Sequence, residues 1–232
     1  MVVICHLLAR EKIFDNLPII NDKFLSFIKK VQSSYLDITY HNKTHASDVT
    51  QTFYFIVANC NLREKCQLDD WDMLSYIIAG ACHDIGHPGY TNPYLIEKQD
   101  EIATRYNDIS VLENYHVATT FELMKNERFN IFESFSPAEA KRIRKQMIGA
   151  ILATDMALHF SKIGIFKGKI QNEDIDFTNF EDKKFICEQI FHICDVSNVA
   201  KPFYLAEKWA NLLFYEFFHQ GDNEKKLNHN VS

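Results

Sequence analysis

Six long segments place apolar residues at helical spacing, and this periodicity constrains the fold more than any other feature of the sequence. The segment DKFLSFIKKVQSSYL carries Phe24, Phe27, Ile28 and Val31 on one stripe. Alternating runs of the kind that form strands are few. The chain is therefore predicted to be all-α. The other segments with this pattern are residues 70–82, 109–125, 137–160, 182–196 and 207–220.

Glycine and proline interrupt the chain rarely, with seven glycines and five prolines in 232 residues. Ser136, Pro137 and Glu139 form the pattern of a helix start, with Ser136 as the N-cap. The stretch HPGYTNP predicts a stop and a turn. No repeat or linker divides the sequence. We expect a single domain over residues 1–232, with its motif-bearing core at about 36–220.

Charge and cysteine content exclude several classes of function. The net charge is −6 and basic residues gather only in short runs, so nucleic acid is not expected as a main partner. The six cysteines include no CxxC pair, which argues against a thiolate zinc site and fits free thiols in the cytoplasm. The apolar opening MVVICHLL is too short to cross a membrane, and no transmembrane segment is expected.

Polar residues that can bind metal interrupt apolar segments at three places. In YHNKTHASDVTQ, His41 and His45 are four residues apart, a spacing that on a helix puts both imidazoles on one face. In MLSYIIAGACHDIGHPGY, an apolar helix runs into His83 and Asp84. In FICEQIFHICDVSN, an apolar run ends in Asp195. A buried carboxylate beside histidines is costly unless it is paired or holds a metal.

The set His45, His83, Asp84 and Asp195 is predicted to form a metal site. A single histidine on an apolar face is more often an ordinary core residue. Four such groups, each at the end or on the inner face of an apolar segment, are harder to explain in that way. Imidazole and carboxylate ligands without thiolates suit zinc, manganese, magnesium or iron. The pattern H…HD…D is also typical of helical metal-dependent phosphohydrolases.

Five motifs that occur in a fixed order point to one protein family. They are YHNKTHASDVTQ, HDIGHPGYTN, YNDISVLEN, ILATDM and CDVSN. Together they resemble the catalytic domain of the class I 3′,5′-cyclic nucleotide phosphodiesterases, from about residue 40 to 220. The wording HPGYTN, RYNDIS and LATDMALH is nearest to the high-affinity cGMP-specific subfamily. The resemblance implies an all-α, multi-helix HD-type domain. It also implies hydrolysis of cGMP, cAMP or both to the 5′-monophosphate, which ends a cyclic-nucleotide signal.

The resemblance implies a role for each matching residue. His45, His83, Asp84 and Asp195 match the ligands of a tightly held metal, usually Zn²⁺, and Asp84 also matches the bridge to a second metal, Mg²⁺ or Mn²⁺. His41 matches the acid that protonates the leaving O3′, and Glu113 the carboxylate that orients it. Residues expected around the metals and phosphate are His87, Asn92, His116, Thr154 and Asp155. Those expected to line the nucleotide pocket are Tyr40, Asn198, Leu213 and Phe217.

Two features fall outside this match. Asp48 is expected to be a surface or supporting residue with no catalytic role. Family members also carry a purine-binding glutamine and a base-clamping phenylalanine after CDVSN, and this chain has no equivalent, since Gln220 lies too early. We therefore expect a partial domain that lacks the family's last helices, with exposed apolar surface and a tendency to form homodimers.

Two alternative functions remain. One is a weak or inactive phosphodiesterase that binds metal or nucleotide, or pairs with full-length relatives. The other is a helical phosphohydrolase that acts on a different phosphate ester.

Overall fold

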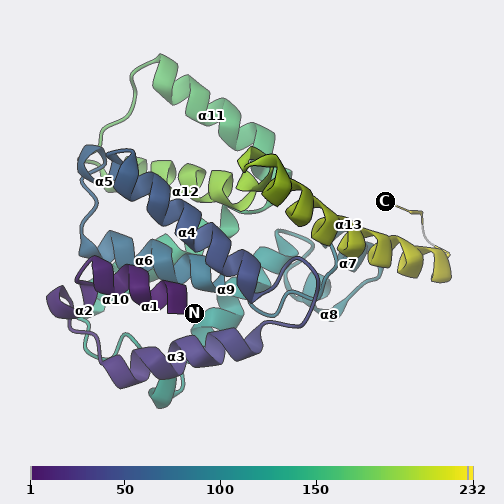
Figure 1. The fold of residues 1–232 in the computed structure, drawn as a ribbon, viewed down its shortest axis with the longest axis horizontal. Coiled ribbons are helices and arrows are strands. Elements are labelled where there is room, and N and C mark those ends of the chain that lie inside the picture. The colour runs from purple at the N-terminus through teal and green to yellow at the C-terminus, as the bar shows by residue number, and fades with distance from the viewer. Residues whose placement is uncertain (1, 229, 232) are drawn as a thin grey trace.

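In the computed structural model, which describes residues 2–228 and 230–231, all regular secondary structure is helical. This confirms the all-α class for the described part of the chain. No single described helix is long and apolar enough to cross a membrane, and the one pair that passes that test together, Pro137–Leu152 with Met156–Gln171, is bent by 79°. The α-helices (Figure 1) are α1 (Val2–Arg10), α2 (Ile13–Asn16), α3 (Asn21–Ser34), α4 (Lys43–Asn59), α5 (Leu62–Lys65), α6 (Asp70–Cys82), α7 (Asn92–Glu97), α8 (Glu101–Arg105), α9 (Val111–Met124), α10 (Pro137–Leu152), α11 (His159–Gln171), α12 (Phe180–Asp195) and α13 (Phe203–Lys226). The 3₁₀ helices are η1 (Glu127–Phe129), η2 (Met156–Leu158) and η3 (Ser197–Ala200).

The helix α6 forms the centre of the fold. Every residue from Asp72 to Cys82 is buried, because α6 is apolar on nearly all sides. Figure 1 shows α6 in the middle of the molecule, with α4 and α12 on one side and α3 on the other. The main core cluster extends from Ile4 in α1 to Cys194 in α12. The end of α6 therefore delivers the next residues, His83 and Asp84, into the interior.

Residues 137–160 form two helices separated by a break, and the prediction of one continuous helix is wrong. α10 ends at Leu152. The Thr154 hydroxyl then donates to a backbone carbonyl of the preceding turn (2.8 Å), and the Asp155 carboxylate accepts the backbone N–H of Ala157 (2.8 Å). Such side-chain bonds to the backbone compete with continuation of a helix. The break holds Thr154 and Asp155 in a buried turn.

His41 precedes α4, so the prediction that His41 and His45 share one helix face is also wrong. α4 begins at Lys43, and Asn42 is its N-cap, with an extended backbone and a side-chain oxygen that accepts the N–H of Thr44 (2.8 Å). The two imidazoles still meet edge to face, with ring centroids 5.8 Å apart. His45 is thus fixed by a helix, whereas His41 depends on contacts with another part of the chain.

The helix α13 turns polar residues toward the body and aromatic residues outward. Glu216, Gln220 and Glu224 are buried at a spacing of four residues. The Gln220 side chain accepts the backbone N–H of Thr91 (2.8 Å), so this amide supports the loop before α7. The large hydrophobic side chains that are more than half exposed on α13 are Phe203, Tyr204, Phe214, Tyr215 and Phe218. The helix therefore carries the exposed apolar surface that the sequence predicts.

Candidate active site

Four side chains from three parts of the fold converge on one point. His45 lies on α4, His83 and Asp84 follow α6, and Asp195 ends α12. His83 Nε2 lies 3.3 Å from His45 Nε2 and 3.1 Å from Asp84 Oδ2. Asp195 Oδ1 lies 2.9 Å from His45 Nε2 and 3.3 Å from His83 Nε2. The structure thus brings together all four residues that the sequence predicts as ligands of one metal.

The donor atoms of this cluster fit a divalent cation. The His83 Nδ1–H donates to the carbonyl of Gly80 (3.0 Å), so Nε2 is the ring nitrogen that faces the cluster. His45 Nε2 lies 3.4 Å from Asp84 Oδ2, a buried oxygen that has no hydrogen-bond partner. Two carboxylates this close together are costly to bury unless positive charge lies beside them. Two imidazoles and two carboxylates are also an ordinary ligand set for zinc.

The charges of the two carboxylates agree with a role as ligands. Burial alone would raise the pKa of Asp84, but the adjacent His83 holds it well below its ordinary value. Burial would also raise the pKa of Asp195, and its hydrogen bonds to His45 and His83 lower it instead. Both groups are therefore ionised at neutral pH, as metal ligands must be.

A second group, formed by Asp84, His87 and His116, adjoins the first. The His116 Nδ1–H donates to the carbonyl of Ile85 (2.8 Å), and the buried His116 Nε2, which has no hydrogen-bond partner, lies 3.9 Å from Asp84 Oδ1. Burial lowers the pKa of His116 to about 4 and that of His87 well below its ordinary value, so both rings are neutral. Asp84 presents one oxygen to each group, which suits a carboxylate that bridges two metals.

Glu113 lies beside Asn92 and not beside His41. The Asn92 Nδ2 donates to Glu113 Oε2 (3.0 Å), and the Asn92 Oδ1 accepts a backbone N–H of α9 (2.9 Å). Burial raises the pKa of Glu113 to about 7. The expectation that Glu113 orients His41 is therefore corrected, because another carboxylate holds that histidine.

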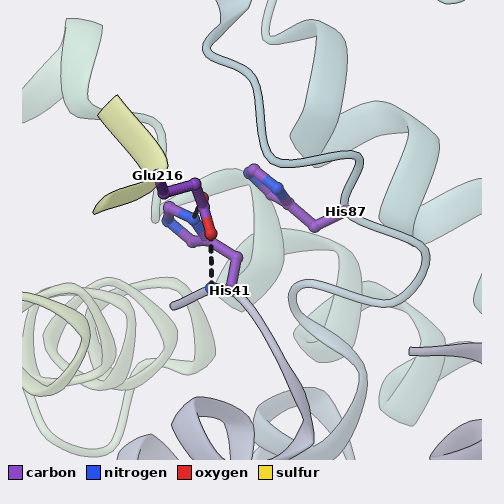
Figure 2. Close-up of side chains that lie close together, drawn as sticks. All are labelled: His41, His87 and Glu216. Carbon is purple, nitrogen blue, oxygen red and sulfur yellow. Dashed lines mark hydrogen bonds and ion pairs between the residues drawn. The ribbon is translucent and has the colours of Figure 1, made fainter. Parts of the chain in front are cut away.

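That carboxylate is Glu216 of α13. The His41 Nδ1 is hydrogen-bonded to Glu216 Oε1, and Glu216 Oε2 accepts the backbone N–H groups of Tyr40 (3.0 Å) and His41 (3.3 Å). Figure 2 shows the Glu216 carboxylate against the His41 ring, with the His87 ring close by. The His41 and His87 rings stack with centroids 4.0 Å apart and planes 13° apart. Sequence reasoning missed Glu216, although a single acid inside the apolar run LLFYEFF was a signal for it.

The contact with Glu216 favours the protonated form of His41. Burial alone would lower the pKa of His41, but the hydrogen bond to Glu216 and the attraction of Asp84 raise it. Burial would raise the pKa of Glu216, and the hydrogen bond to His41 lowers it. The ring stacked on His41 belongs to His87, which is neutral and adds no opposing charge.

The other predicted residues lie at the edges of the site. The Tyr40 hydroxyl donates to Asn198 Oδ1 (2.5 Å), so the structure brings these two together. Asp155 Oδ2 accepts the hydroxyl of Ser110 (2.6 Å), next to Thr154 in the break after α10. Leu213 is partly buried and Phe217 is 44% exposed, and both lie on α13 near Glu216.

Comparison with known proteins shows the family to which the chain belongs. Residues 40–232 match the family described as 3′5′-cyclic nucleotide phosphodiesterase. The chain belongs to this family. A mouse (Mus musculus) high affinity cGMP-specific 3′,5′-cyclic phosphodiesterase 9A is 41% identical to this phosphodiesterase-family chain over 195 residues, which are 84% of this chain and 36% of the mouse protein.

Two further relatives widen the comparison. A probable 3′,5′-cyclic-AMP phosphodiesterase pde-4 of Caenorhabditis elegans is 33% identical over 100% of this chain and 35% of that protein. The 3′,5′-cyclic-nucleotide phosphodiesterase regA of Dictyostelium discoideum is 36% identical over 88% of this chain and 26% of that protein. The chain thus spans about a third of the length of the curated relatives it matches.

Proposed function

We propose that this chain hydrolyses 3′,5′-cyclic nucleotides to nucleoside 5′-monophosphates with two divalent metals. The observation that carries the proposal is the convergence of His45, His83, Asp84 and Asp195 on one point, with His41 at its edge. Hydrolysis of a cyclic phosphodiester needs charge neutralisation at the phosphate and a proton for the departing oxygen. The site supplies residues for both tasks.

Each part of the metal centre has a proposed role. The four converging residues would hold Zn²⁺ at the tight site, and Asp84 would bridge to Mg²⁺ or Mn²⁺ at the second. When bound, the metals supply an activated water and neutralise the charge on the phosphate. The polar residues around them would orient waters and phosphate oxygens; these are His87, Asn92, Glu113, His116, Thr154 and Asp155.

His41 would donate the proton to the leaving O3′ of the nucleotide. Its Nδ1 is engaged by Glu216, so Nε2 is the nitrogen left to donate. Glu216 keeps the ring protonated and fixes its orientation, which is what a general acid requires near neutral pH. A positioned acid of this kind contributes about 10²–10⁴-fold to a rate.

The identity of the base is the finer part of the proposal. Tyr40, Asn198, Leu213 and Phe217 would line the nucleotide pocket. The mouse relative is named as cGMP-specific and the nematode relative as acting on cAMP, so both nucleotides belong in the test. The predicted location remains the cytoplasm.

The exposed aromatic face of α13 favours a second candidate. A phosphodiesterase-like chain that binds metal or nucleotide with little turnover could use Phe214, Tyr215 and Phe218 to pair with a relative or with its own copy. Cyclic-nucleotide binding without hydrolysis, at saturating metal, would support this candidate over the first.

The deciding experiment is hydrolysis of cGMP and of cAMP, separately, by the purified chain with Zn²⁺ and Mg²⁺. We expect turnover that His83→Ala abolishes, because one of the converging lone pairs is lost. His6→Ala, a change of an exposed histidine on α1, should leave turnover unchanged. Absence of turnover from folded, metal-loaded protein would reject the proposed hydrolysis.

A further inference from the structure

Asp48 is not one of the proposed metal ligands. It connects α4, which carries His45, with η3, which follows Asp195. It is on α4, three residues after His45, and its partner Asn198 is in η3, three residues after Asp195. The Asn198 Nδ2 donates to Asp48 Oδ2 (3.1 Å). The other oxygen, Asp48 Oδ1, accepts from the Lys201 ammonium (2.8 Å). One carboxylate thus binds both an amide and a cation.

This arrangement decides which way the Asn198 amide points. An ionised carboxylate can only accept hydrogen bonds, so Asp48 must face the NH₂ end of the amide. The carbonyl end then faces Tyr40, whose hydroxyl donates to it (2.5 Å). Burial raises the pKa of Tyr40, so the phenol stays protonated and remains a donor. A flipped amide would set NH₂ against hydroxyl and carbonyl against carboxylate, and lose both bonds.

Lys201 holds the Asp48 carboxylate in the position that this orientation needs. The Asp48 and Lys201 side chains are each only 19% exposed, and their contact offsets the cost of holding a charge there. Lys201 also occupies Oδ1, which leaves Oδ2 for Asn198. The neighbouring Asn198 is itself buried. The amide is therefore fixed before any ligand arrives.

We propose that Asp48 is a positioning residue that sets the polarity of the Asn198 amide and thereby the affinity for the nucleotide base. This inference rests on the proposed function, in which Asn198 lines the base pocket. A purine edge that bonds to an amide distinguishes its carbonyl from its NH₂, so a fixed amide binds one pattern of donors and acceptors. The hydrogen bonds of the Asp48 carboxylate go to Asn198 and Lys201, so Asp48 acts on the site through Asn198.

The kinetic test is Asp48→Asn, which keeps the shape of the side chain and removes the obligatory acceptor. We expect KM for the preferred cyclic nucleotide to rise about tenfold, since a mispaired amide loses the value of about one hydrogen bond. The kcat and the Zn²⁺ affinity should stay within about twofold of wild type. If Asp48 only held α4 to η3, kcat and metal affinity would fall together, and the positioning role would be rejected.

Two further variants sharpen the test. In an Asn198→Ala background, Asp48→Asn should raise KM no further, because the residue through which it acts is gone. Additive effects would contradict the inference. Asp70→Asn is the matched control: Asp70 is also ion-paired, to Arg63 (2.6 Å), and its side chain is 22% exposed at the start of α6. It should leave KM unchanged.

A measurement that needs no turnover separates this inference from the proposed function. In protein labelled with [¹⁵N]asparagine, the Asn198 side-chain amide is the signal that disappears in Asn198→Ala. Asp48→Asn should shift that signal, because its proton loses a carboxylate acceptor, whereas Asp70→Asn should not. An unshifted signal overturns the role of Asp48 even if the chain hydrolyses cyclic nucleotides. A shifted signal with no hydrolysis supports the positioning contact while the proposed reaction fails.

Discussion

The hydrogen bond between His41 and Glu216 joins residues 175 positions apart in sequence. This contact gives the two glutamates of the site, Glu216 and Glu113, different environments. Glu216 faces the imidazole and lowers the cost of its positive charge, while Glu113 faces Asn92 and, with a pKa raised to about 7, holds a proton more readily than an ordinary carboxylate. The two glutamates should therefore respond differently to the same substitution.

Glu216→Gln should move the pH dependence of the proposed hydrolysis. His41 must be protonated to act as an acid, so the rate falls as pH rises through its pKa. Because Glu216 raises that pKa, removing its charge should shift this fall to lower pH. At pH 8 we expect kcat to drop by about tenfold or more, with a smaller loss at pH 6. The pH–rate profile of kcat measures this.

Exposed Glu122 offers the control for that profile, and Glu122→Gln should leave it in place. If Glu113→Gln moved the fall in kcat to another pH and Glu216→Gln did not, the assignment of Glu216 to His41 would be contradicted.

The same pairing of His41 with Glu216 predicts a pH window for folding stability. The contribution of His41, whose pKa is raised, to the free energy of unfolding is fully present below its ordinary pKa. It is lost as pH rises through the raised value. The contribution of Glu216 is lost as pH falls through its lowered pKa.

Three of the four residues proposed as metal ligands lie at the ends of helices. His83 and Asp84 follow α6, and Asp195 is the last residue of α12. Without a cation, these ends bring lone pairs and two ionised carboxylates together, and a bound metal would tie α4, α6 and α12 to one point. A metal that binds only the folded state adds its binding free energy to folding.

Zn²⁺ should therefore raise the thermal unfolding midpoint of the chain. At a free concentration of about 100 Kd the gain is about 2.7 kcal/mol, which is about 5–10 °C for a domain of this size. His83→Ala should lose the shift, and His6→Ala should retain it. Equal shifts in both variants, measured by differential scanning calorimetry, would place the binding site elsewhere.

The elements also show what could be predicted from the sequence. The period of apolar residues predicted α6 to its last residue, and the capping box of Ser136 and Glu139 is formed as expected. The break after Leu152 was missed because its cause is local: Thr154 and Asp155 bond to the backbone within an apolar run that continues past them. Periodicity does not report such bonds.

The candidate site divides in the same way. The convergence of the four residues proposed as metal ligands could be predicted because each stands next to an apolar segment and their chemistry is specific. Glu216 could not be assigned, since its partner is set by how α13 docks on the rest of the fold. Helix docking is a tertiary property, and the spacing of residues within α13 carries no information about His41.

On the scale of the whole molecule, α13 exposes several aromatic side chains. Phe214 and Phe218 stack with centroids 6.2 Å apart and are 51% and 67% exposed. Exposed apolar patches of this kind are typical of association sites. Figure 1 shows α13 at one edge of the molecule, where a second copy could approach it.

We expect the purified chain to form homodimers through this helix. Phe214→Ser combined with Phe218→Ser should lower the mass measured by sedimentation equilibrium toward that of the monomer, because the apolar contact is removed. Phe55→Ser is the matched change, since Phe55 is 60% exposed on α4. It should leave the mass unchanged. A wild-type chain that stays monomeric at all concentrations would rule out the association.

The docking of α13 also sets an order of events during synthesis. The four residues proposed to hold the metal are complete once Asp195 has been made, whereas the partner of His41 arrives only with Glu216. A nascent chain can therefore bind the proposed metal before His41 has its carboxylate partner, and the docking of α13 completes the site.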